Sequence, residues 1–179
     1  MKQRIAVIVG STREGRVGDS VADWFVGIAK QRDDIDVELV DLVDYRFPAR
    51  FPEEVTDEMN RFTAAIDRAD GFVVVTPEYN RSFPASLKQA IDYAYDEWHA
   101  KPVGFVSYGC RSRGHHAVAA LRVVFADLHT VAVRDEVALD LMETQPGPAW
   151  EPAAGTLLDQ LVWWGDALRT ARAARPYVA

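Results

Sequence analysis

The sequence lacks several features that mark whole classes of protein. Its 179 residues contain one cysteine, Cys110, which excludes an internal disulfide framework and is typical of a reducing cytoplasm. No apolar run approaches the roughly 20 residues that a membrane-spanning helix needs. An excess of basic residues is also missing, because 20 Lys and Arg against 27 Asp and Glu leave a net charge of -7. Nucleic acids and anionic membrane surfaces both need a basic face, so neither is an expected partner.

The N-terminus shows no pattern of a secretory signal. A short apolar stretch, Ile5–Val9, ends in a turn signal and is not followed by a small-residue cleavage site. Internal repeats and low-complexity linkers are also missing. With 49% hydrophobic residues, a chain of this length can bury one core, so we expect a single domain over 1–179 in a cytoplasmic protein.

A regular alternation of two patterns runs through the chain. Continuous β-branched runs are typical of strands buried on both faces, and amphipathic stretches between them are typical of helices that cover a sheet. Prolines and glycines mark the connections at 44–53 and 139–151. The predicted strands cover 5–9, 37–42, 71–76, 102–108 and 130–137, and the predicted helices cover 19–31, 54–69, 83–98, 116–128 and 152–174.

Five such units in alternation predict an α/β fold with a parallel sheet and helices on both faces. Right-handed crossovers leave few topologies, and the strand order 2-1-3-4-5 is a common one for five strands, although the pattern alone leaves other orders open. In that order the ligand crevice lies at the carboxyl ends of the first and third strands. The loops that follow the strands are therefore the first place to look for a site.

The loop after the first strand, Gly10–Gly18, has the composition of an anion site. Backbone amides that enter a helix N-terminus favour an anion, and the hydroxyls of Ser11 and Thr12 add donors. Arg13 and Arg16 add charged donors suited to phosphate. A plain turn with solvated arginines is the alternative.

Two glycine-rich nucleotide motifs fail in this loop. A Walker A loop needs Lys after its second Gly, but Gly15 is followed by Arg16. A dinucleotide fingerprint needs a glycine where Thr12 stands, so the backbone would be kept from a pyrophosphate. A terminal monophosphate fits the loop better than either.

Two further loops reach the same predicted edge of the sheet. The loop over 76–84 is stiffened by Pro77 and Pro84, and its exposed amides suit the polar edge of a planar ring with Tyr79 beside it. The alternative is a surface loop in which Ser82 caps the next helix. In the loop over 107–116, Gly109 and Gly114 permit a close approach of backbone to a ligand.

These segments resemble one known family. Gly10–Arg13, the block from Thr76 to Pro84 with Leu87–Asp92, and Ser107–Gly109 are similar to the NAD(P)H-dependent FMN reductases, which include quinone, azo-dye and chromate reductases. The resemblance spans about 4–128, and its most specific part is Pro77–Asn80. It implies a flavodoxin-like three-layer sandwich that binds FMN and uses NADPH or NADH as co-substrate.

The resemblance also implies roles for individual residues. Ser11 and Arg13 would hold the FMN phosphate, together with the backbone of Val17, Gly18 and Asp19. The isoalloxazine would be lined through main-chain groups, and its pyrimidine side would be contacted by a third set. The lining residues would be Pro77, Glu78, Tyr79 and Asn80, and the pyrimidine contacts Ser107, Tyr108 and Gly109.

In this family the flavin carries the hydride chemistry, so no side chain is assigned as catalytic. Hydride would pass from NAD(P)H through FMN to free flavin, a quinone or a similar small acceptor in ping-pong fashion. A flavodoxin-type electron carrier without NAD(P)H oxidation is the alternative, and a flavin-free binding module is a third possibility. The resemblance leaves the preference for NADPH or NADH open. Many relatives carry a glycine where this chain has Arg113, which would alter the room or charge near the flavin, and the loop Tyr45–Pro52 has no counterpart on which to base a role.

The resemblance further implies self-association, as a homodimer or homotetramer. Tyr93, Tyr95 and Trp98 are candidate interface residues, with ordinary core packing as the alternative. We expect no metal site, because the adjacent His115 and His116 cannot face one another on a helix. A lone Cys110 without a resolving partner is expected to be redox-inert.

Overall fold

A computed structural model describes residues 2–142 and 146–178. The order of strands in the sheet is β2-β1-β3-β4-β5, all parallel, with β6 also paired to β4. The strands are β1 (Gln3–Val9), β2 (Ile35–Asp41), β3 (Gly71–Pro77), β4 (Pro102–Gly109), β5 (Val131–Ala132) and β6 (Val137–Asp140). The predicted α/β class and the order 2-1-3-4-5 are therefore confirmed.

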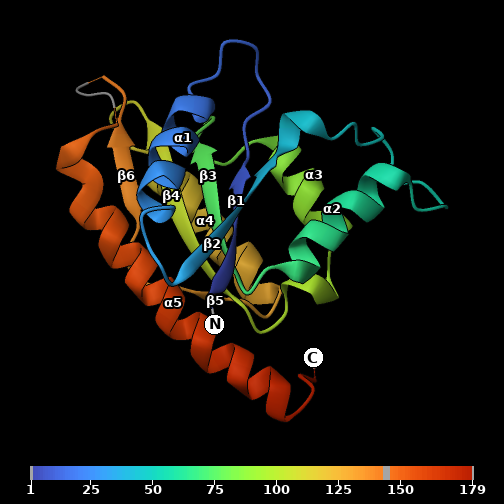
Figure 1. The fold of residues 1–179 in the computed structure, drawn as a ribbon. Coiled ribbons are helices and arrows are strands. Elements are labelled where there is room, and N and C mark those ends of the chain that lie inside the picture. The colour runs from blue at the N-terminus through green and yellow to red at the C-terminus, as the bar shows by residue number, and fades with distance from the viewer. Residues whose placement is uncertain (1, 143–145, 179) are drawn as a thin grey trace.

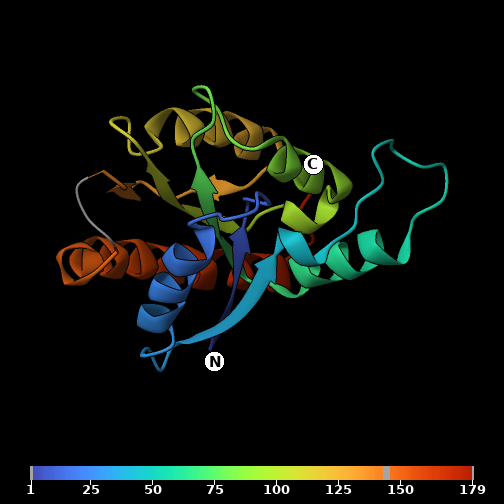
Figure 2. The ribbon, with the colours of Figure 1, turned by 90° about the horizontal axis from the view of Figure 1, so that it is seen from above.

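Helices cover both faces of this sheet (Figures 1 and 2). The α-helices are α1 (Gly18–Ala29), α2 (Asp57–Arg68), α3 (Ala85–Tyr93), α4 (His115–Asp127) and α5 (Glu151–Ala174), and three 3₁₀ turns are η1 (Leu42–Asp44), η2 (Asp96–Trp98) and η3 (Pro148–Trp150). In the described part of the chain, no helix is long and apolar enough to cross a membrane.

The two faces of the sheet carry separate hydrophobic cores, as the alternation along β1 shows. Ile5 and Val7 point to the face packed by α1 and α5, whereas Ala6 and Ile8 point to the face packed by α2, α3 and α4. Every residue of β3 is buried, which agrees with its continuous apolar run. Burial on both faces holds the register of the central strands and so positions the loops at their carboxyl ends.

The fifth predicted strand is broken in two. Val131 pairs with Pro102, and Val137 pairs with Val106. The chain from Val131 to Val137 is therefore two residues longer than the stretch of β4 that it accompanies. The second segment runs to Asp140, into the connection predicted over 139–151, of which 143–145 lie outside the described residues. The prediction of one continuous strand over 130–137 is therefore wrong.

The third predicted helix is also shorter than expected. It ends at Tyr93, and the predicted remainder to Trp98 contains the separate turn η2. The Trp98 indole is fully buried and donates to the carbonyls of Ile91 and Ala94, which fixes this turn against the end of α3. The aromatic residues Tyr93 and Trp98, whose spacing suggested one helix, thus belong to two elements, α3 and η2.

Candidate cofactor site

The first loop leaves β1 at Val9 and enters α1 at Gly18, at the carboxyl edge of the sheet (blue, top of Figure 1). No side chain within the described residues caps the N-terminus of α1, whose N-cap residue is Val17. The first amides of the helix therefore keep their donors for a bound anion. The predicted backbone donors at Val17, Gly18 and Asp19 all lie at this helix start.

The turn into α1 packs so closely that it needs a glycine. A Cβ atom on Gly18 would lie 2.4 Å from the Ser11 Oγ and 2.8 Å from the Tyr108 hydroxyl oxygen. The Tyr108 hydroxyl donates to Ser11 Oγ at 3.1 Å, and burial raises the pKa of Tyr108 to about 12. Two residues of the first loop and one near the end of β4 thus form a buried cluster at the base of that loop.

This arrangement places Ser11 differently from a simple phosphate ligand. The residue is 0% exposed, and its hydroxyl faces Tyr108 and Gly18 in the interior. Ser11 therefore supports the loop from behind, and a direct contact between its hydroxyl and a phosphate stays a prediction. Likewise, the Tyr108 phenol lies under the first loop, which leaves main-chain groups as its means of touching a ligand.

The two arginines of the first loop have different roles. Arg16 donates to both carboxylate oxygens of Asp41 at 2.7 and 2.5 Å, and it also pairs with Asp19 at 2.5 Å. Hydrogen bonds to Asp41 raise the pKa of Arg16. Arg16 thus pairs with two carboxylates and ties the loop to the end of β2, and a contact between its guanidinium and a phosphate stays a prediction.

Arg13 is the exposed arginine of this loop. Its guanidinium lies over the Tyr79 ring, 4.3 Å from the centroid, so it joins the first loop to the second. A guanidinium held by an aromatic face keeps its donor edge available for an anion. The structure therefore places Arg13 and Tyr79 together, as two of the predicted cofactor contacts.

The second loop folds into a tight turn after β3. Tyr79 and Ser82 exchange backbone hydrogen bonds at 2.8 and 3.0 Å, and the two residues between them, Asn80 and Arg81, have φ of 50° and 64°. Two consecutive residues with positive φ define a type I′ turn, which Asn tolerates and Arg adopts at a cost. Ser82 pairs across this turn and does not cap α3, whose N-cap is Pro84.

Glu78 connects the second loop to the third. Its amide donates to the Tyr108 carbonyl at 3.1 Å, and its carboxylate accepts from the His116 amide at 3.1 Å. Burial alone would raise the pKa of Glu78, but hydrogen bonds from Ser112 and His116 outweigh it and lower the pKa below its usual value. The side chain therefore holds two loops together as a carboxylate.

The third loop closes on itself through a buried serine. Ser107 Oγ donates to the Arg113 carbonyl at 2.8 Å, and a Cβ on Gly114 would lie 2.5 Å from the Ser107 Cβ. Gly114 has φ of +89°, which explains why a glycine precedes α4. Gly109 lies at the carboxyl end of β4, beside the end of β3. The predicted residues Ser107, Tyr108 and Gly109 thus lie at the same edge as Pro77.

A cavity of about 240 Å³ adjoins the first loop on the side of β2. It is lined by Thr12 of the first loop, by Ser86 and Gln89 of α3, and by Tyr45 and Phe47. The carbonyl of Pro48 accepts hydrogen bonds from Gln89 and from the Tyr93 hydroxyl, so the loop Tyr45–Pro52 is anchored to α3. An aromatic wall therefore borders the predicted cofactor crevice.

The candidate interface and metal residues lie as follows. Trp98 and Tyr93 are buried within the chain, whereas Tyr95 is 57% exposed. His115 lies beside Glu136 and His116 beside Glu78, and the described residues hold no group of three or more side chains suited to a metal ion. The single Cys110 is exposed.

Several residues of the site carry no motif and escaped sequence reasoning. Asp41 binds Arg16 from the end of β2, and His116 binds Glu78 from the start of α4. Each of them lies at the carboxyl end of a strand or at a helix start on the same edge, which was the available signal. Their partners could not be assigned from spacing, because the contacts join segments that are 25 and 38 residues apart.

The site fits a terminal phosphate. Three observations support this: an uncapped helix start, a glycine whose Cβ would fill the turn, and an exposed arginine beside it.

Comparison with known proteins gives a family match for most of the chain. Residues 3–144 match the family model described as NADPH-dependent FMN reductase.

Curated relatives agree with the family match. The chain is 36% identical over 135 residues to an NAD(P)H-dependent FMN reductase of Schizosaccharomyces pombe, covering 67% of this chain and 68% of the relative. It is 36% identical over 132 residues to a reductase of the same description from a Nectria species, of which it spans 65%. A quinone reductase of Pseudomonas putida KT2440 is 36% identical over 136 residues, with 69% and 71% covered.

Solved structures agree on the fold. The flavoenzyme FerB of Paracoccus denitrificans, an NAD(P)H:(acceptor) oxidoreductase, superimposes with a TM-score of 0.76 at 23% identity over 92% of this chain and 98% of that chain. A flavodoxin of Pseudomonas aeruginosa gives 0.58 at 20% identity over 91% and 99%. The predicted flavodoxin-like fold is thereby confirmed.

Proposed function

Because the chain belongs to the NADPH-dependent FMN reductase family, we propose that it is an FMN-dependent NAD(P)H oxidoreductase that reduces a small acceptor such as a quinone or free flavin. The observation that carries the proposal is the meeting of three loops at one edge of the sheet, with Arg13 over Tyr79 and an uncapped α1 beside them. Quinone reductases among the relatives support this class of acceptor.

The residues of this chain would bind and orient the cofactor. Arg13 and the amides at the start of α1 would hold the phosphate, and the stiff turn at Asn80 and Arg81 would present main-chain groups to the ring. Bound FMN would supply the hydride chemistry, accepting from NAD(P)H and donating to the acceptor in two half-reactions. The contacts of Arg16, Glu78 and Tyr108 would keep the three loops fixed meanwhile.

One set of measurements separates this function from its alternatives. The purified chain is titrated with FMN and followed by its visible spectrum, and the oxidation of NADH and of NADPH is then recorded with and without a quinone. Bound FMN with quinone-stimulated oxidation and parallel double-reciprocal lines is the expected result. Bound FMN without oxidation would indicate an electron carrier, and a failure to bind FMN would remove both flavin functions.

A substitution tests the phosphate assignment separately. Arg13→Ala should weaken FMN about ten-fold or more, because a charged donor to the phosphate is lost, while riboflavin should be weakened far less. Flavin fluorescence quenching measures both affinities, and Arg50→Ala, an exposed arginine of the neighbouring loop, is the control. Equal losses for FMN and riboflavin would contradict the assignment.

We also propose that the chain self-associates, as the family resemblance implies. The exposed Tyr95 after α3 is the one of the three candidate aromatics that is available for such a contact. Light scattering of the wild type and of Tyr95→Ala tests this. A wild-type mass of one chain would contradict it.

A further inference from the structure

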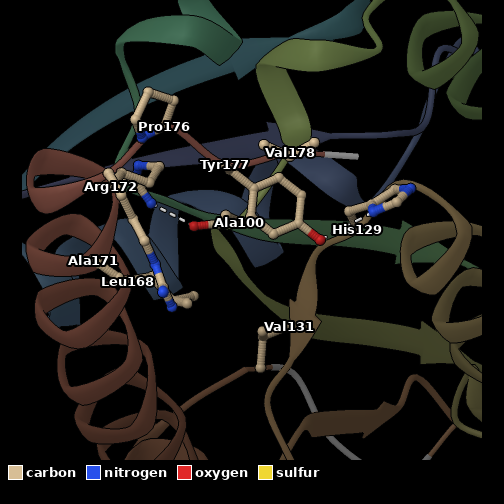
Figure 3. A pocket seen from close by; sticks show the side chains of 10 residues that line it. Ala100, His129, Val131, Leu168, Ala171, Arg172, Pro176, Tyr177 and Val178 are labelled. Carbon is tan, nitrogen blue, oxygen red and sulfur yellow. Dashed lines mark hydrogen bonds between the residues drawn. The ribbon is translucent and has the colours of Figure 1, made fainter.

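A second cavity lies at the opposite edge of the sheet from the cofactor loops. The last turns of α5 extend past the sheet, and the segment 176–178 folds back beside them (red, bottom of Figure 1). They enclose a cavity of about 520 Å³ with Val131 at its base and Leu168 and Ala171 along one wall (Figure 3). The length of β4 separates it from the predicted flavin crevice by roughly 25 Å.

The charged groups of this cavity are two guanidinium groups. Arg172 and Arg175 line it, beside the polar side chains of His129 and Tyr177, and no carboxylate lines it within 2–142 and 146–178. The remaining lining is mostly apolar. A cavity of 300–1,000 Å³ that combines apolar walls with a few converging polar groups has the usual form of a small-molecule site.

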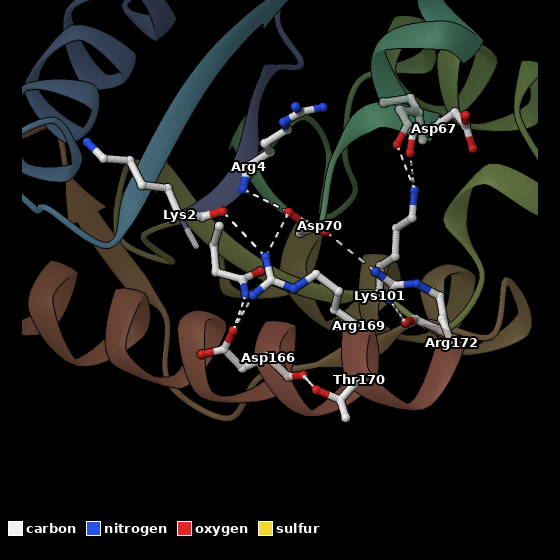
Figure 4. Close-up of polar contacts among 12 residues, drawn as sticks. Lys2, Arg4, Asp67, Asp70, Lys101, Asp166, Arg169, Thr170 and Arg172 are labelled. Atoms are coloured by element: carbon white, nitrogen blue, oxygen red, sulfur yellow. Dashed lines mark hydrogen bonds and ion pairs between the residues drawn. The ribbon is translucent and has the colours of Figure 1, made fainter. Parts of the chain in front are cut away.

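The charge of Arg172 is incompletely compensated. Its guanidinium donates to the carbonyl of Ala100, but its ion-pair partner Asp70 is 3.7 Å away, beyond hydrogen-bond distance. Asp70 is also shared with Arg169 at 3.7 Å and accepts from the Arg4 amide at 3.1 Å (Figure 4). Burial lowers the pKa of Arg172, as expected for a cation that has lost water without gaining a full partner.

A neighbouring cavity of about 640 Å³ shares Arg172, Tyr177 and Val178 with the first but has a lining of mixed charge. Its charged side chains are three carboxylates and three cations, those of Asp67, Asp70, Asp96, Arg68, Lys101 and Arg172. Tyr177 lies between the two, and its hydroxyl is 3.0 Å from Nδ1 of His129, which fixes the 176–178 segment as a wall. An anion would therefore meet carboxylates as well as cations in the neighbouring cavity, whereas the described lining of the first cavity holds two arginines and no carboxylate.

We propose that the cavity between α5, β5 and 176–178 is a binding site for a small apolar carboxylate. The carboxylate group would pair with Arg172 and Arg175, whose fork of N–H donors matches two carboxylate oxygens. The apolar body would pack on Leu168 and Val131. This site is separate from the proposed flavin reaction and would be present whether or not that reaction is confirmed.

The test uses a fluorinated probe on the FMN-loaded protein. Titration with 4-(trifluoromethyl)benzoate, followed by ¹⁹F line broadening, should show saturable binding, and the neutral 4-(trifluoromethyl)benzyl alcohol should bind at least about five-fold more weakly. Arg175→Gln should weaken the carboxylate probe to a similar degree. Arg134→Gln, an exposed arginine outside the cavity, is the matched control and should leave binding unchanged.

A second variant tests whether the probe occupies the cavity itself, because a change of charge at Arg175 could also weaken binding from a distance. Ala171→Trp fills the cavity from an exposed helix position and should abolish probe binding while FMN binding persists. The proposal would be overturned if the probe showed no saturable binding, or if Arg175→Gln and Arg134→Gln weakened it equally. Loss of probe binding in Arg13→Ala would also overturn it, because the probe would then bind in the flavin crevice. A lower oligomeric mass of Ala171→Trp, in a protein that does not bind the probe, would identify the cavity as a contact between copies and would overturn the proposal as well.

Discussion

At the scale of single residues, Gly18 allows a steric test of the first loop. A methyl group at this position would lie 2.4 Å from Ser11 Oγ and 2.8 Å from the Tyr108 hydroxyl oxygen, and both belong to buried residues. Gly18→Ala should therefore displace the first loop from the start of α1. We expect FMN affinity to fall about ten-fold or more, measured by fluorescence titration, and the free energy of unfolding to fall by about 1–3 kcal/mol.

Gly27 in the same helix provides the control. A Cβ there would meet nothing within 4 Å, so Gly27→Ala adds only a better helix former. It should raise the free energy of unfolding by up to about 1 kcal/mol and leave FMN affinity unchanged. Similar affinities for both variants would contradict the steric argument.

The residue scale also shows how far sequence reasoning reached. The composition of the first loop predicted an anion site, and the geometry of α1 supports it, but composition alone did not separate Arg13 from Arg16, and the family resemblance named Arg13 without a physical reason. Only the structure shows that Arg16 lies between Asp41 and Asp19 while Arg13 lies over Tyr79. Such pairings depend on contacts between distant segments, which local spacing does not encode.

At the scale of elements, Lys101 connects β4 to the end of α2. The residue is 6% exposed, and its ammonium donates to the carbonyls of Ile66 and Asp67, in the last turn of the helix, at 3.0 and 2.8 Å. Cations are favoured at a helix C-terminus, yet burial lowers the pKa of Lys101 from 10.5 to about 8. Asp67, Asp70 and Glu97 oppose that shift in the pKa, and Arg172 adds to it.

This shift predicts a pH dependence of stability. Below about pH 8 the charged form is present in both states, and its burial costs the folded state roughly 3 kcal/mol. Between about pH 8 and 10.5 the unfolded chain binds more protons, so the cost is relieved as pH rises. The free energy of unfolding of the wild type should therefore gain roughly 2 kcal/mol on that of Lys101→Met between pH 7.5 and 10, measured by urea denaturation.

Lys30→Met, at the exposed end of α1, serves as the comparison for this experiment. The difference between the wild type and this variant should stay flat over the same range of pH, because the Lys30 side chain is exposed to solvent in the folded as well as in the unfolded state. A flat difference for Lys101→Met as well would show that its ammonium is solvated in the folded protein.

The elements themselves were largely predictable, and the exceptions have physical reasons. Buried β-branched runs identified β1, β3 and β4, because a strand covered on both faces must be apolar throughout. The break between β5 and β6 was missed, although three consecutive charged residues, Arg134–Glu136, interrupt the apolar run between Val131 and Val137. The two extra residues between β5 and β6 show only in the pairing with β4. That pairing depends on the neighbouring strand and cannot be derived from this segment alone.

At the scale of the whole molecule, the distribution of charge matters more than its sum. The chain carries a net charge of -7, yet the three loops over 10–17, 78–83 and 109–114 contain five arginines and two glutamates. Arg16 is neutralised by its carboxylate partners, whereas Arg13, Arg81 and Arg111 are exposed. An acidic molecule with basic loops at one edge attracts anionic ligands to that edge.

The last prediction follows from this asymmetry. The association rate of FMN, measured by stopped-flow fluorescence, should fall several-fold between about 20 and 200 mM ionic strength, because salt screens exposed charges beyond about 10 Å. Riboflavin, which lacks the phosphate, should show little dependence, and Arg111→Gln should slow FMN at low salt with little change in its dissociation rate. An equal salt dependence for both flavins would indicate that the basic loops act only after contact, as ligands to the phosphate.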